Sequence, residues 1–324
     1  MNRLRLGFQI PCRLPASRIA ALARRVEEAG FDELWLVEDC FFAGGIAASA
    51  TALAATERIG VGIGILPAVA RNAAFTAMEV AALAEAHPGR FTAGLGHGMR
   101  DWMRQIGAAP ASPLTALAEH LDAVRRLLAG ETVTTQGRYV RLDGVRLEFP
   151  PEPPPPVVAG VRGPRSLEVS GRHADGTVLA EPVTPAYLAS ARASIARGRV
   201  GRESPHTITA YTLFHADDDL GRARDALRPA LAGPVADPAW AAHLADVDLG
   251  PRRAAVAALP PAERAAALPA DWIDCLSACG PPERCLERVR ETGAAGADTV
   301  VLCPVGDTDE QLARAAALPA LLAR

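Results

Sequence analysis

The sequence has no lysine: all 34 of its basic residues are arginine. A lysine Schiff base, a pyridoxal-phosphate anchor and the lysine of a P-loop are therefore excluded. Anion binding by a charged side chain then falls to arginine, which keeps its charge and can hold a phosphate or a carboxylate through two hydrogen bonds.

Long apolar runs are missing as well. No stretch of about 18 consecutive apolar residues occurs, and the start MNRLRLGFQIPCRLP passes straight into a strand-like segment without the apolar core of a signal peptide. We therefore expect a cytoplasmic protein that has no membrane contact. The net charge is −3 and the arginines are scattered, so no nucleic-acid partner is expected either.

The six cysteines contain one cluster, Cys275, Cys279 and Cys285 in the segment CLSACGPPERC. Its spacing is not that of a CxxC zinc pair, and no histidine lies nearby to complete a tetrahedral ligand set. We interpret these residues as buried or incidental thiols and expect no metal site.

One layout recurs along the chain, in GFDELWLVED (30–39), HADGTVLAEP (173–182) and GADTVVLCPVG (296–306). In each unit a helix ends near a small residue, an Asp follows, and an apolar, β-rich run begins. Apolar runs without alternation are typical of parallel strands that are buried on both faces. The pattern predicts eight strands, over residues 4–10, 34–38, 59–66, 91–96, 157–161, 177–180, 207–215 and 299–303. Helices are predicted over residues 15–29, 46–57, 73–86, 113–128, 164–173, 185–197, 281–292 and 309–322.

Eight strand–helix units in 324 residues predict an α/β fold, a (β/α)8 TIM barrel that forms a single domain over 1–324, rather than an open sheet. Two insertions interrupt the repeat. Residues 132–149 alternate apolar and polar side chains around two Gly-containing turns, which predicts a small hairpin of antiparallel strands. Residues 217–275 are rich in Ala and Pro and are expected to hold short helices. In barrel enzymes such segments usually form the rim of the active site, but the sequence is equally compatible with a structural cover.

The segment RFTAGLGHGMRDW (90–102) carries a run of glycines at the end of the predicted fourth strand. Its GxGxG spacing and its place differ from the GxGxxG fingerprint of a dinucleotide-binding first strand. Glycines at the carboxyl end of a barrel strand let a planar ligand approach the backbone, which makes Gly96 and Gly98 candidate cofactor-binding residues. The pattern alone leaves open a tight turn without a ligand.

Several motifs occur in a fixed order, with the β-insertion between two long segments: VGIGILPAVARNAAFTAMEVAALAEAHPGRFTAGLGHG (61–98) and VVAGVRGPRSLEVSGRHADGTVLAEPVTPAYL (157–188). They carry a resemblance that extends over nearly the whole chain. In order and spacing this arrangement resembles the luciferase-like monooxygenase superfamily. Within it, the chain is similar to the branch of coenzyme F-420-dependent reductases of methylenetetrahydromethanopterin. The resemblance implies a deazaflavin cofactor, F-420, with FMN as the alternative because the superfamily divides between the two, and a small organic substrate. A homodimer is left open.

The resemblance also implies residues that hold the cofactor. GIGIL resembles the bulge at which these proteins often have a non-proline cis peptide behind the cofactor ring, and the corresponding bond here joins Gly64 and Ile65. The segment from Gly160 to Pro164 resembles the loop that binds the cofactor phosphate. Its chemistry agrees, because free N–H groups at a helix start beside Gly163 and the charge of Arg162 suit an anion. An ordinary helix start with an exposed arginine is the alternative for these residues.

The predicted second strand ends in WLVEDC, which places Glu38 and Asp39 at the catalytic face of a barrel, where a carboxylate can bind a ring or carry a proton. A cap on the following loop is the structural alternative for Asp39. Many relatives have Asp-His where this chain has Asp39-Cys40, and a thiol is a poorer proton donor at pH 7 unless its pKa is lowered. His97 in the glycine turn is the nearest replacement, although a turn histidine can also serve as a structural hydrogen-bonding group.

Three functions follow from this reading. The first is hydride transfer between F-420 and a small organic substrate, with an acid among Asp39, Cys40 and His97. The second is an FMN-dependent monooxygenase on the same barrel. The third is a barrel that has lost catalysis and acts as a binding protein, because the Asp-His pair is incomplete.

Overall fold

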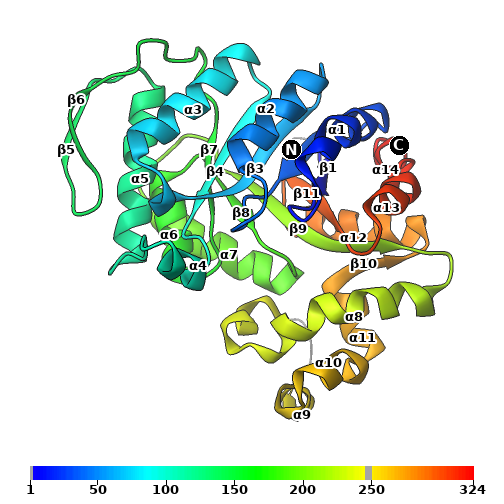
Figure 1. Ribbon diagram of the computed structural model, residues 1–324. Helices are drawn as coiled ribbons and strands as arrows, with labels where there is room; N and C mark the ends of the chain where they lie inside the picture. Colours follow the sequence, from blue (N-terminus) through cyan, green and yellow to red (C-terminus); the bar gives the residue numbers. More distant parts are fainter. Residues whose placement is uncertain (1–2, 245–249) are drawn as a thin grey trace.

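The computed structural model describes residues 3–244 and 250–324, and in this part of the chain eight parallel strands close into a barrel (Figure 1). Neighbours around the barrel follow chain order, and β11 pairs with β1 while β8 pairs with β9, which closes the ring. The TIM barrel that the sequence predicts is therefore confirmed, and an open sheet is ruled out. The barrel strands are β1 (Arg5–Ile10), β2 (Glu33–Leu36), β3 (Gly60–Pro67), β4 (Phe91–Gly96), β7 (Val157–Gly160), β8 (Gly176–Leu179), β9 (Thr207–Ala216) and β11 (Thr299–Pro304).

Helices cover the outside of the barrel (Figure 1). Several begin with a proline in the first turn, including Pro113, Pro164 and Pro185, where the missing N–H costs no hydrogen bond and the fixed φ suits a helix. The outer helices are α1 (Ile19–Glu28), α2 (Gly45–Ala55), α3 (Ala73–Ala86), α5 (Pro113–Leu128), α6 (Pro164–His173), α7 (Pro185–Gly198) and α12 (Pro282–Ala294). None of the helices in the described part of the chain is both long and apolar enough to cross a membrane.

One helical prediction needs correction, and one short helix was not predicted. The single helix predicted over 309–322 is two helices, α13 (Thr308–Ala315) and α14 (Leu318–Leu322). Pro319 explains the break, because in a continuous helix its ring would clash with the carbonyl of Ala315 and would leave that carbonyl without an N–H partner. The sequence also missed the short helix α4 (Arg100–Gln105), which follows β4 directly.

The strands are apolar on both faces because one face packs against the helices and the other fills the barrel. All six residues of β11 are buried. Side chains from five barrel strands form one separate cluster, which consists of Trp35, Val158, Val178, Tyr211, Val301 and Cys303. This packing explains why the barrel strands lack the alternation of a half-exposed sheet.

The region of the first insertion holds β5 (Val133–Gln136) and β6 (Arg141–Val145), an antiparallel pair that projects from the side of the barrel near α3 and α5 (Figure 1). Gly144, at one of the predicted turns, has a φ of +62°, a backbone conformation that favours glycine. The single-domain organisation of the whole chain stays a prediction.

The second insertion is helical where it is described, and residues 245–249 of it lie outside the described part. Its elements are α8 (Leu220–Ala236), the 3-10 helix η3 (Pro238–Leu244), α9 (Gly250–Ala258), α10 (Pro261–Ala267) and α11 (Ala270–Leu276). They share an apolar cluster of their own that includes Leu227 and Trp272. After α11 comes β10 (Ser277–Gly280), which the sequence missed and which pairs in parallel with the last residues of β9.

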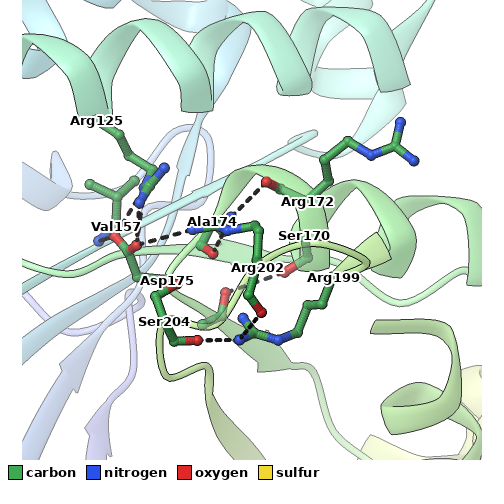
Figure 2. A network of polar contacts seen from close by, with 10 residues as sticks. Arg125, Val157, Ser170, Arg172, Ala174, Asp175, Arg199, Arg202 and Ser204 are labelled. Carbon is green, nitrogen blue, oxygen red and sulfur yellow. Dashed lines mark hydrogen bonds and ion pairs between the residues drawn. The ribbon is translucent and has the colours of Figure 1, made fainter. Parts of the chain in front are cut away.

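The amino-terminal end of β8 is fixed by a polar network around Asp175 (Figure 2). Arg125 donates to both carboxylate oxygens of Asp175, with Nη2 2.6 Å from Oδ1, and the backbone N–H of Val157 donates to Oδ2 at 3.1 Å. Arg202 donates to the carbonyl of Ala174 at 3.2 Å. These bonds connect α5, β7 and β8 at the amino-terminal end of the barrel, opposite to the face where barrel enzymes bind their substrates.

Candidate active site

A cavity of about 870 Å³ lies at the carboxyl ends of the barrel strands. Most of the residues predicted for the site line it together, namely Glu38, Asp39, Gly64, Ile65, His97, Gly98, Gly160, Arg162 and Gly163. The other two, Cys40 and Gly96, lie outside the lining that the described residues form. Trp240 and His243 of the second insertion also line the cavity, so this insertion contributes to the rim.

A bulge in β3 forms one wall of the cavity. The Gly64–Ile65 peptide is cis, as the resemblance predicts, and the pairing of β3 with β4 shifts between Ile63 and Leu66. The side chain of Ile65 in the bulge packs against Gly160, where a Cβ would lie only 2.1 Å from Cγ2 of Ile65. Glycine at position 160 therefore makes room for the Ile65 side chain.

The glycine run of β4 leaves room for the same bulge. A Cβ at Gly94 would lie 2.1 Å from the carbonyl oxygen of Ile63, and a Cβ at Gly96 would lie 2.7 Å from the carbonyl oxygen of Gly160. Gly98 lines the cavity and has a φ of +69°, so it is the turn residue of the run. Gly94 and Gly96 thus allow the backbone of neighbouring strands to lie close to β4. Of the three glycines, only Gly98 lines the cavity where a ligand would lie.

Tyr211 of β9 stands behind the bulge, and the sequence did not single it out. The residue is 4% exposed, and its hydroxyl lies so close to Gly64 that a Cβ there would be 2.1 Å from Oη. Within the described part of the chain this hydroxyl has no hydrogen-bond partner. Leaving a buried polar group unpaired costs about 1–3 kcal/mol. A polar ligand atom in the cavity that Tyr211 lines would supply that partner.

Glu38 is held by strong contacts of its own. Both of its carboxylate oxygens accept bonds from Arg71, at 2.5 and 2.7 Å, and Oε2 also accepts the backbone N–H of Gly45 at 2.6 Å. Gly45 is the first residue of α2, so this carboxylate caps the helix in the way that favours an anion at an N-terminus. The contacts favour a structural role for Glu38 over the proton transfer that the sequence allowed.

Asp39 accepts a hydrogen bond from a thiol in the loop that follows β1. Cys12 donates its S–H to Oδ2 of Asp39 at 3.5 Å. Burial raises the pKa of Asp39, and burial together with the Asp39 charge raises the pKa of Cys12 to about 11. The pKa of the Cys40 thiol is raised in the same way, by burial and by the charges of Glu38 and Asp39. Both thiols therefore stay protonated at neutral pH and are weak acids.

His97 links β4 to α6. Its Nε2 and the Oγ of Ser166 share a hydrogen bond at 2.9 Å. Burial lowers the pKa of His97, so the imidazole is neutral at pH 7. A neutral ring that is already bonded to the first turn of α6 favours a role in holding the loop over a role as a proton donor.

The start of α6 forms one end of the cavity. The guanidinium of Arg162 lies 4.3 Å from the centre of the Trp240 ring, and the Tyr187 hydroxyl donates to the Arg162 carbonyl at 3.0 Å. Gly163 is the N-cap of α6 and has no side-chain cap, and a Cβ at this position would meet no atom within 4 Å. The free N–H groups of the first helical turn and an arginine held over an indole can therefore accept a phosphate.

Glu181 is the acidic residue that sequence reasoning missed. It follows β8 and lines the cavity, and burial, followed by the charge of Asp39, raises its pKa to about 7. A signal for it was present, because Glu181 in HADGTVLAEP occupies the same place in the repeated unit as Glu38 in GFDELWLVED.

Comparisons with known proteins agree with this geometry. The family model for luciferase-like monooxygenases matches residues 7–299. The 5,10-methylenetetrahydromethanopterin reductase of Methanolobus tindarius is 30% identical over 307 residues, which cover 92% of this chain and 93% of that protein. The F-420-dependent glucose-6-phosphate dehydrogenase of Nakamurella multipartita is 27% identical over 75% of this chain and 79% of its own. The solved structure of the coenzyme F-420-dependent tetrahydromethanopterin reductase of Methanopyrus kandleri superposes with a TM-score of 0.83 at 21% identity and covers 98% of each chain.

Proposed function

The chain belongs to the luciferase-like monooxygenase family, and on that premise we propose that it transfers a hydride between coenzyme F-420 and a small organic substrate. One observation carries the proposal: the bulged wall at Gly64–Ile65 and the start of α6, whose free N–H groups suit an anion, line the same cavity. A flat ring with a phosphate-bearing tail needs both features at once. Relatives with F-420 in their names support this choice of cofactor over FMN.

The residues present fit such a ligand. Tyr211 offers a buried hydroxyl that lacks a partner in the described part of the chain, and Gly163 leaves an open space that a side chain would fill. When bound, F-420 supplies hydride chemistry, which no protein side chain can supply. The chain's own contribution is to position the reactants and to hold the proton that accompanies the hydride.

Apolar side chains line part of the cavity, among them Ile65, Phe42 and Trp102, and Trp240 of the second insertion lines it as well. An apolar lining strengthens the electrostatic contacts that a bound ligand makes beside it. Arg162 would hold the phosphate of the cofactor at the rim, where its charge needs no full burial.

Separate reconstitution with each cofactor tests the proposal. The purified protein is mixed with F-420 or with FMN, passed through a desalting column, and its absorption spectrum is recorded. Retention of F-420 and weaker retention of FMN are expected. Retention of FMN alone would support the flavin monooxygenase instead, and retention of neither would support a barrel without catalysis.

A further inference from the structure

Three acidic residues line the cavity in the described part of the chain: Glu38, Asp39 and Glu181. Glu181 stands at the carboxyl end of β8, two residues beyond Leu179, and lines the cavity with Asp39 and Tyr211. Titratable groups face it from three other elements: Asp39 after β2, Tyr211 on β9 and Cys303 on β11. Burial raises the pKa values of Tyr211 and Cys303 well above their usual ranges, so both are neutral.

The equivalent residue of the second strand shows what is special about Glu181. Glu38 is compensated by the guanidinium of Arg71 and by the N–H of Gly45. Among the ion pairs that residues 3–244 and 250–324 form, none includes Glu181. Its own backbone N–H is the contact that favours the charged form, and burial and the charge of Asp39 oppose it. Two glutamates at the same place in the repeat thus have opposite surroundings, which is how proteins separate a fixed anion from a group that exchanges a proton.

The other polar groups near the cavity are poorly suited to proton transfer. Cys40 lies outside the lining and is a weak acid. His97 is neutral and shares a hydrogen bond with Ser166. Asp39 accepts a hydrogen bond from the thiol of Cys12, which favours its carboxylate form. An acid works best when its pKa is near the working pH, and the value of about 7 for Glu181 meets that condition.

We propose that Glu181 is the catalytic proton carrier of this enzyme. In the reducing direction, the hydride forms a new C–H bond at the carbon of a C=X group, the π pair moves onto the heteroatom X, and the Glu181 carboxyl gives its proton to X. The products are H–C–X–H, the Glu181 carboxylate and the oxidised deazaflavin, which has lost the hydride and carries the matching positive charge, so charge and atoms balance. The reductant is the reduced deazaflavin of the proposed function, on which this inference rests. In the oxidising direction the Glu181 carboxylate takes the proton back.

The first test needs neither cofactor nor substrate. Side-chain carboxyl resonances of glutamate are followed by carbon-13 NMR between pH 4 and pH 9 in the wild type, in Glu181→Gln and in the matched control Glu203→Gln, which changes an exposed glutamate. One resonance with a midpoint near pH 7 is expected, because burial and the charge of Asp39 raise the pKa of Glu181 to about 7. It should vanish in Glu181→Gln and persist in Glu203→Gln. A Glu181 midpoint below about pH 5, close to the ordinary value of a free glutamate, would overturn the proposal whatever the substrate.

The second test measures binding and turnover separately. Glu181→Gln should bind F-420 within about twofold of the wild type, since the amide keeps the shape of the side chain. With reduced F-420 and a probe substrate, either acetone or methylenetetrahydromethanopterin, its kcat should fall about a hundredfold or more, the usual contribution of a general acid. Glu181→Asp, which keeps a carboxyl, should recover part of the loss. In the wild type kcat should fall as the pH rises through 7, and this limb should be absent in Glu181→Gln.

The outcomes separate the two proposals. If F-420 does not bind the wild type, the proposed function fails, and the NMR titration alone decides whether Glu181 exchanges a proton near neutral pH. If F-420 binds and Glu181→Gln keeps the wild-type kcat and pH profile, the role of Glu181 is wrong and the proposed function stands.

Discussion

Removing the Arg162 side chain tests the anion-binding end of the cavity. The guanidinium is held over Trp240 at 4.3 Å and faces the cavity, and no carboxylate pairs with it among the ion pairs of the described residues. A hydrogen bond to a charged group contributes roughly 1.5–3 kcal/mol. Arg162→Ala should therefore weaken F-420 binding about ten- to more than a hundredfold.

The loss should be partial because the backbone donors remain. Gly163 and the first turn of α6 keep their N–H groups in the variant, and these still attract a phosphate. Fold stability should change little. The contact with Trp240 is partly exposed, and a cation–π pair in such a place contributes about 0.5–1 kcal/mol.

Fluorescence titration with F-420 measures the effect, and Arg165→Ala is the matched control. Arg165 is an exposed residue of α6 that lies three positions after Arg162 and does not line the cavity, so its removal changes the net charge equally without removing a contact. It should bind F-420 with nearly wild-type affinity. Equal affinity of Arg162→Ala and the wild type for F-420 would show that the phosphate lies elsewhere. An equal loss of affinity in Arg165→Ala would show that the effect comes from long-range attraction between positive charge and the phosphate.

Three further predictions concern the cavity wall and its acid. Gly163→Val should weaken F-420 binding more than Arg162→Ala while leaving thermal stability nearly unchanged, because the new side chain enters open space that the ligand needs. Gly160→Ala should lower the free energy of unfolding by about 1–3 kcal/mol in urea titrations, since its Cβ would lie 2.1 Å from Ile65. The raised pKa of Glu181 means that the folded protein binds a proton that the unfolded chain has lost, so stability should fall as the pH rises from the usual glutamate value toward 7. The fall should be about 2 kcal/mol after allowance for partial exposure, and a Glu181→Gln variant that kept it would contradict the assignment.

The barrel could be predicted because its strands are long enough and apolar enough to be recognised without their partners. Each strand of the ring is covered on both sides, so the sequence shows continuous apolar runs such as Thr299–Pro304. β10 escaped prediction because its four residues, Ser277–Gly280, carry no such run and are extended only through pairing with the end of β9. Its structure depends on a tertiary contact that the local sequence does not encode.

The site could be predicted where it depends on backbone geometry. Glycines mark positions at which a Cβ would collide, as at Gly94 and Gly160, and the motif around Gly64 pointed to the cis peptide that the structure has. Tyr211 and Trp240 could not be found in this way. Their importance comes from where distant segments meet, since one lies on β9 and the other on the second insertion.

Glu38 and Glu181 show why chemistry is harder to read than fold. The repeated unit places a glutamate at the end of β2 and another at the end of β8, and nothing in either segment distinguishes their roles. The difference comes from Arg71, which lies 33 residues beyond Glu38 in the chain and neutralises it, whereas no described arginine pairs with Glu181. One partner thus makes the first carboxylate a structural anchor for α2, and the lack of one leaves the second able to exchange a proton near neutral pH. It follows that giving Glu181 a nearby arginine should lower its pKa and abolish that exchange, even though the carboxylate itself would remain in the cavity.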